Sequence, residues 1–128
     1  MLPEFSAKRA TSFNELIRTS TEKNEILNDL EDFIAILNSQ NITPILITTP
    51  CFEPYVKVLD REQLKKNEAD ILTLAKKFNL SYWNYLELPL PKEAFFNRDH
   101  LNREGAKMFA AILNKKIIDE VRMQNLKG

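Results

Sequence analysis

Glycine, cysteine and histidine are scarce in this 128-residue sequence, which has two, one and one of them respectively. Phosphate-binding loops and nucleophile elbows depend on glycine, and neither GxGxxG, GxxxxGK[ST] nor GxSxG occurs. Cys51 cannot form a disulfide within the chain, which is compatible with a reducing compartment. One histidine, one cysteine and no carboxylates clustered at ligand spacing argue against a metal site. No motif indicates a cofactor.

Net charge and long apolar runs are absent as well. Eighteen acidic and eighteen basic residues balance to a formal net charge of zero. Nucleic acid or an anionic membrane would call for a basic excess, so neither is expected as the main partner. No apolar run approaches the ~20 residues that span a bilayer. The start, "MLPEFSAKRATSF", lacks the pattern of a signal peptide, so the cytoplasm is the default location.

What is present is an alternation of helical and strand patterns. Over residues 21–38 the apolar side chains recur at spacings of one, three and four, which predicts an amphipathic helix. The run "ITPILITTP" (42–50) is short, apolar and β-branched, and it predicts a strand buried on both faces. Pro44 is tolerable there because it lies at the beginning of the strand.

A second helix and a second strand follow. Asp60 and Gln63 form a capping-box pattern for a helix over 61–78, and Asn79 is a plausible C-terminal stop. The aromatic-rich "LSYWNYL" (80–86) predicts the second strand. A final helix over about 103–124 has Asn102 as its expected N-cap. Leu72 is expected on the inner face of the helix over 61–78, and Val121 on the inner face of the final helix.

Strands that alternate with helices at this spacing imply a parallel βαβ unit in an α/β fold. We expect 42–48 and 80–85 to be neighbouring parallel strands joined by a right-handed crossover. Two strands of this kind leave open apolar edges. The N-terminal segment 1–20 offers no convincing strand, so 21–128 is interpreted as the C-terminal portion of a larger α/β domain. The missing N-terminal half, or self-association, would then complete the sheet.

The segment "RDHLNREGA" resembles the last sequence block of the SGNH (GDSL-like) hydrolases, an Asp-x-x-His pattern followed by glycine and the C-terminal helix. With "ITPILITTP" and "LSYWNYL", the resemblance covers about residues 21–120. It implies a three-layer, flavodoxin-like α/β/α sandwich and an esterase, lipase or acetyl- or acyltransferase. The substrate would be a small-molecule or carbohydrate ester. His100 then corresponds to the catalytic histidine.

The sequence also departs from that family. The Gly-Asp-Ser block with the nucleophile and the blocks that supply the oxyanion hole are absent. Asn97 stands where the family has the aspartate of the triad. An amide can orient an imidazole but cannot stabilise the imidazolium by charge, and the comparable change in a serine protease costs roughly 10⁴ in turnover. Asp99 is the alternative acid, although adjacent side chains usually diverge.

Three further residues follow a strand end, where open α/β sheets place their ligands. Cys51 could pair with His100 in a dyad, although a small buried thiol is the simpler interpretation. Thr49, like its neighbour Thr48, could hydrogen-bond a substrate or could simply end the strand. Tyr55 could flank a cleft or cover the helix that follows it. We therefore consider these three as candidate substrate-binding residues.

Three hypotheses remain. In the first, the chain is the C-terminal part of an SGNH-type ester hydrolase that donates His100 to a serine elsewhere, and it is inactive alone. In the second, it is a degenerate, non-catalytic SGNH-like module for binding or assembly. In the third, it is an unrelated flavodoxin-like signalling or scaffold domain. A Gly-Asp-Ser block in the preceding coding sequence would separate the first from the second.

Overall fold

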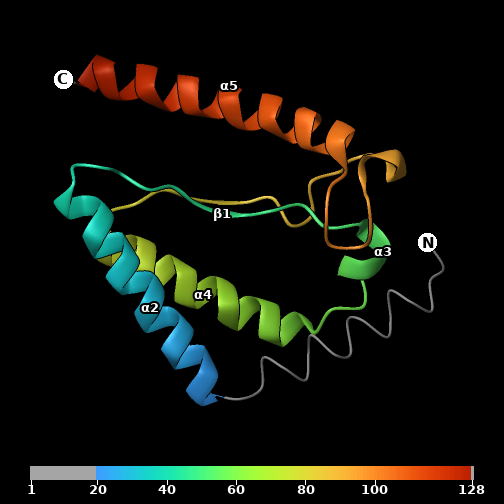
Figure 1. Ribbon diagram of the computed structural model, residues 1–128, viewed down its shortest axis with the longest axis horizontal. Coiled ribbons are helices and arrows are strands. Elements are labelled where there is room, and N and C mark those ends of the chain that lie inside the picture. Colours follow the sequence, from blue (N-terminus) through green and yellow to red (C-terminus); the bar gives the residue numbers. More distant parts are fainter. Residues whose placement is uncertain (1–19, 128) are drawn as a thin grey trace.

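The computed structural model describes residues 20–127, in which helices alternate with two short strands (Figure 1). The elements are α2 (Ser20–Ser39), β1 (Leu46–Thr48), α3 (Glu53–Val56), α4 (Arg61–Phe78), β2 (Tyr82–Asn84), the 3-10 helix η1 (Lys92–Ala94) and α5 (Arg103–Lys127). The predicted segment 1–20 lies outside this range except for its last residue. No helix within 20–127 is long and apolar enough to cross a bilayer.

β1 and β2 form a parallel pair, which confirms the predicted βαβ arrangement with α4 as the connection. Leu46, Ile47 and Thr48 lie opposite Tyr82, Trp83 and Asn84. The N–H of Leu46 donates to the Ser81 carbonyl at 3.0 Å, and the N–H of Tyr85 donates to the Thr48 carbonyl at 2.9 Å. Each strand has three residues, fewer than predicted. Pro44 cannot donate to a ladder, which limits how far the pairing extends toward the start of β1.

The two ends of α4 follow from local sequence signals. The Asp60 carboxylate accepts hydrogen bonds from the N–H groups of Glu62 at 3.0 Å and Gln63 at 3.1 Å. These bonds satisfy two donors that a helix start leaves unpaired. Asn79 adopts the left-handed conformation, with φ 53° and ψ 48°, which is a common way to end a helix. The predicted range 61–78 is confirmed.

Side chains of β2 contact helices on both faces of the strand pair. On one side, the Lys116 ammonium of α5 lies 4.8 Å from the ring centroid of Trp83. On the other side, Asn84 Nδ2 donates to Glu68 of α4 at 3.1 Å. Figure 1 shows the same arrangement, with α5 on one side of the strands and α2 and α4 on the other. The strand pair therefore lies between helices, in a mixed α/β structure.

Several positions that the sequence pattern assigns to a core are exposed. Ile47 of β1 is 36% exposed, and Leu72 of α4 and Val121 of α5 are each 50% exposed. The prediction that both strands are buried on two faces is therefore wrong for β1 in the described structure. The apolar periodicity of a helix or strand identifies the face that can be buried. It does not show whether another element of the chain packs against that face. The buried hydrophobic residues are Ile34, Tyr55, Val56, Leu59, Leu74, Ala75, Trp83, Ala94 and Phe109.

Candidate functional site

His100 lies in a short loop between η1 and α5. Phe95 and Leu101 form an isolated antiparallel bridge at the base of this loop. Inside it, the N–H groups of Phe96 and Asn97 both point at the His100 carbonyl, at 2.9 and 3.4 Å. The chain thus reverses direction over a few residues, and this places side chains from both arms of the loop next to one another.

Asn102 ties this loop to the start of α5. Its side-chain Oδ1 accepts from the N–H of Gly105 at 2.9 Å, so the predicted N-cap is confirmed. Its own N–H donates to the Ala94 carbonyl at 2.9 Å. A third tie comes from the segment after β1, where the Phe52 N–H donates to the Arg98 carbonyl at 2.8 Å. Hydrogen bonds therefore connect the loop to η1, to the first turn of α5 and to the segment that follows β1.

The imidazole of His100 is paired at one nitrogen with two oxygen atoms. Its Nδ1 lies 3.0 Å from Asn97 Oδ1 and 3.1 Å from Asp99 Oδ1. Asn97 Oδ1 also accepts the backbone N–H of Asp99 at 3.2 Å, which assigns the amide oxygen to this side. Two acceptors at Nδ1 require the proton to be there, so neutral His100 presents Nε2 as a proton acceptor.

Asp99 and Asn97 both contact the ring of His100, although only one of them was expected to do so. Adjacent side chains were expected to diverge, but the tight reversal at 96–100 turns Asp99 back onto the ring of His100. The amide of Asn97 therefore orients the imidazole while a carboxylate also contacts it. The His100 side chain is 67% exposed and the Asp99 side chain 23%. Because so much of the ring is solvated, any electrostatic gain from this pair is strongly screened.

A large apolar cavity adjoins this loop, between the strand pair and the helices α2 and α4. Its volume is about 940 Å³. Thr48 and Asn84, the last residues of the two strands, line it, and so does Asp99. It thus lies at the carboxyl ends of parallel strands, where ligands of open α/β sheets bind. The apolar lining residues from α2, α4 and the loops include Ile26, Leu27, Leu59, Leu64, Ile71 and Leu86.

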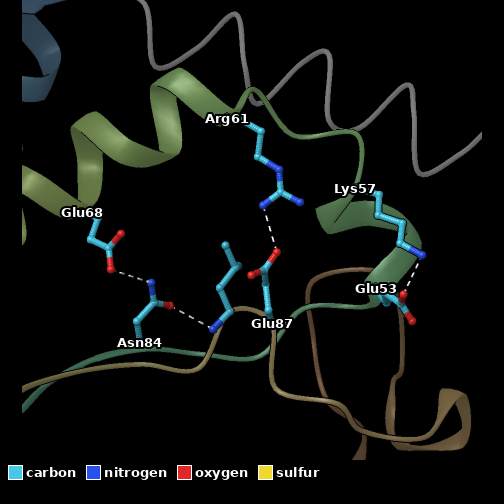
Figure 2. Close-up of polar contacts among 7 residues, drawn as sticks. Glu53, Lys57, Arg61, Glu68, Asn84 and Glu87 are labelled. Atoms are coloured by element: carbon cyan, nitrogen blue, oxygen red, sulfur yellow. Dashed lines mark hydrogen bonds and ion pairs between the residues drawn. The ribbon is translucent and has the colours of Figure 1, made fainter.

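Polar contacts beside the cavity join α4 to the last residue of β2 and to the chain after it (Figure 2). Arg61 donates to Glu87 at 2.9 Å, and Glu68 accepts from Asn84. Asn84 Oδ1 in turn accepts the N–H of Leu86 at 3.0 Å. The acids that line the cavity are Glu22, Glu68, Asp70, Glu87 and Asp99, and the bases are Lys23, Arg61 and Lys65. Carboxylates therefore outnumber cations among the described lining residues.

Cys51 lines this cavity but is poorly suited to be a nucleophile. Burial, with a further contribution from the nearby charge of Asp99, raises the pKa of its thiol from 9.0 to about 11. The thiolate is the reactive species, and reactive cysteines have lowered rather than raised pKa values. Cys51 also packs against Tyr55 and Leu59. This environment favours the interpretation of Cys51 as a small buried thiol.

The other two candidate residues occupy different environments. Tyr55 lies on α3, a short helix that the sequence analysis did not predict, and it is buried at the cavity wall. Pro54 in its first turn was the available signal. Thr49 is exposed. Its neighbour Thr48 lines the cavity instead, with its hydroxyl 2.7 Å from the hydroxyl of Tyr82.

Within residues 20–127, no group of three or more His, Cys, Asp and Glu side chains is placed to hold a metal ion. Ser81, the residue before β2, donates its hydroxyl to Glu120 of α5 at 2.7 Å, so this serine is hydrogen-bonded to a carboxylate and not to His100.

Comparison with known proteins finds no match to this chain among family models, curated proteins or solved structures.

Proposed function

We propose that this chain is the C-terminal part of an SGNH-type ester hydrolase and contributes His100 as its general base. The observation that carries the proposal is the pairing of His100 Nδ1 with Asn97 and Asp99, at 3.0 and 3.1 Å. A base held by Nδ1 in this way offers Nε2 to a nucleophile, as in the serine triad. Asn97 and Asp99 act as positioning residues.

The chemistry proposed is acyl transfer from an ester to a serine outside the described residues. The serine oxygen attacks the ester carbonyl carbon while His100 Nε2 takes the hydroxyl proton. The same nitrogen then returns the proton to the departing alkoxide, which leaves as the alcohol. Water attacks the resulting acyl-serine in a second, equivalent step and releases the acid. His100 is unchanged at the end of each cycle.

Two structural observations support the proposal. The strand pair has helices on both faces, which agrees with the three-layer α/β/α sandwich of that family. The Nε atom of Arg98, next to Asp99, is buried and has no hydrogen-bond partner in the described structure. A buried donor left unpaired costs about 1–3 kcal/mol. An acceptor from the complementing half of the domain would remove this cost beside His100.

The test is complementation measured by hydrolysis of p-nitrophenyl acetate. A polypeptide encoded upstream that carries a Gly-Asp-Ser block is produced together with this chain. We expect turnover of the pair, lowered at least ~10²-fold by His100→Ala, the lower range for general-base catalysis. Arg103→Ala, an exposed substitution in the first turn of α5, serves as the control. No such block upstream, or a complementing pair without turnover, contradicts the proposal.

The chain by itself should show no turnover, since oxyanion-hole donors and the serine block provide most of the rate. The same assay on wild type, Cys51→Ala and His100→Ala checks this expectation. Saturable activity that is lost in both variants would establish a Cys51–His100 dyad instead. With a thiol pKa of about 11, only about one Cys51 in 10⁴ is ionised at pH 7, so this outcome is not expected.

A second candidate function is a non-catalytic binding or assembly module. The observation that favours it is a group of exposed apolar side chains on one face of α5, formed by Ile117, Ile118 and Val121. Exposed apolar patches commonly mark protein interaction sites. If the complementing half binds but gives no turnover, and His100→Ala leaves that binding unchanged, the module interpretation replaces the enzyme.

A further inference from the structure

The cavity between the strand pair and the helices α2 and α4 is closed at one end and open at the other. Near α3, its lining residues Tyr55 and Leu59 are only 3% and 6% exposed. Near the start of α2, its lining residue Ile26 is 66% exposed. A cavity wall that is apolar and still largely exposed offers surface for a further apolar group to cover. In the described structure, the α2 end of the cavity is therefore uncovered.

Ion pairs between α2 and α4 set the spacing of the two helical walls of the cavity. Lys23 Nζ lies 2.5 Å from Asp70 Oδ2, and both residues line the cavity. Farther along the same two helices, Lys77 is paired with Glu31. Partly exposed pairs add little stability, but two of them at separate points fix how far apart the helices lie. The cavity of about 940 Å³ is thus formed by the described residues themselves.

The chain carries an apolar segment directly before α2. In "SFNELI" (12–17), the apolar residues are Phe13, Leu16 and Ile17, separated by three and by one position. This spacing is typical of one apolar stripe of an amphipathic segment. Amphipathic segments dock into apolar grooves through side chains at such positions. The segment 12–17 therefore has the pattern of a groove-binding sequence.

The tether between this segment and the cavity is short. Ile17 is three positions before Ser20, the first residue of α2, so the two lie within about 11 Å of each other. Phe13, seven positions before Ser20, lies within about 25 Å. Ile26 is six residues into α2, about 9 Å along the helix from Ser20. Because a short tether gives an effective concentration in the millimolar range, even a weak intrinsic affinity suffices for docking.

We propose that the segment 12–17 docks through its three apolar side chains into the open end of this cavity. At the closed end, Cys51 packs against buried residues, and Asp99 lies 3.1 Å from Nδ1 of His100. A ligand that approaches His100 through the cavity must first displace the segment, which acts as an autoinhibitory strap. The inference goes beyond the proposed hydrolase and does not rest on it, because a binding module would be blocked in the same way.

Photo-crosslinking of the full chain tests the docking directly. The photoreactive amino acid p-benzoylphenylalanine replaces Leu16, or Thr11 as the control, which falls on the opposite side of the same periodic pattern. From position 16 of the monomer we expect crosslinks to the lining residues Leu64 and Ile71 of α4, mapped by mass spectrometry. Position 11 should give severalfold fewer. Equal yields from both positions, crosslinks to other surfaces, or crosslinks only between two copies would overturn the inference.

The reactivity of Cys51 provides a second readout, since it is the single cysteine and lines the cavity. Leu16→Asp should accelerate its alkylation by N-ethylmaleimide at pH 9 severalfold, because a carboxylate is not buried against apolar walls. Thr11→Asp adds the same charge on the polar side and should leave the rate unchanged. A peptide of residues 1–19 in excess should slow the Leu16→Asp variant again, whereas the same peptide with Leu16→Asp should not.

Equal alkylation rates in wild type and both variants would refute the strap. An acceleration that the peptide does not reverse would refute it as well, since a loosened fold would produce the same acceleration. Neither experiment measures turnover, so a failure of complementation would refute the proposed enzyme and leave the result on the strap standing.

Discussion

Gly105→Ala should destabilise the chain even though alanine is the better helix former. Gly105 is buried in the first turn of α5, where it faces η1. A methyl group added there would lie 1.9 Å from the Ala94 carbonyl oxygen and 2.8 Å from its carbonyl carbon. Its φ is not positive, so glycine is needed at this position for space rather than for backbone freedom.

The magnitude follows from three opposing contributions. Alanine in a helix interior is favoured over glycine by about 1 kcal/mol. The clash is with backbone atoms of Ala94, which is fully buried, so the cost lies near the top of the ~1–3 kcal/mol found for overpacking. Movement of Ala94 would also disturb the hydrogen bond that its carbonyl accepts from Asn102, worth about 1 kcal/mol. The net loss is therefore about 2–3 kcal/mol.

The assay is urea unfolding followed by far-ultraviolet circular dichroism and by the fluorescence of Trp83. Ala106→Gly, at the next and exposed position of α5, is the matched control and should cost about 0.5–1 kcal/mol. Gly105→Ala should cost more than this reverse substitution. A gain in stability of about 1 kcal/mol would show that α5 does not pack against η1 as described.

Three further predictions concern the cap of α4, the thiol and the exposed surface. Asp60→Ala removes two hydrogen bonds and should lower the free energy of unfolding by about 1 kcal/mol in the same urea assay; no change would contradict the cap. Alkylation of Cys51 should keep accelerating with pH until about 11, since burial raises its pKa to about 11; a plateau near pH 9 would contradict this. Because the folded chain holds that proton more tightly than the unfolded chain, stability should fall between about pH 9 and 11 in wild type and not in Cys51→Ala. Exposed apolar residues such as Ile47 and Val121 should make the isolated chain self-associate in sedimentation experiments, whereas a monomer at high concentration would count against a missing half.

The helices were predictable because the signals that set them lie within a few residues of each end. Asp60 and Asn79 mark the two ends of α4, and Asn102 caps α5 through the N–H of Gly105. The parallel pairing of the strands also followed, since a short strand, a helix and a short strand leave few other topologies. The extent of burial could not be predicted from the sequence. The exposure of Ile47 depends on whether another element packs against that face of β1, and the apolar pattern of the strand carries no information about this.

By itself, then, the sequence determined the order of elements, their caps and the position of His100 before α5. Only the tertiary structure decided what surrounds the imidazole. The reversal of the 96–100 loop brings Asn97 and Asp99 to the same Nδ1, although one-residue spacing normally separates side chains. The apolar cavity likewise arises only when α2, α4 and the strand ends meet. Both features depend on distances between groups that the backbone path brings together, and those distances are not encoded in any local pattern.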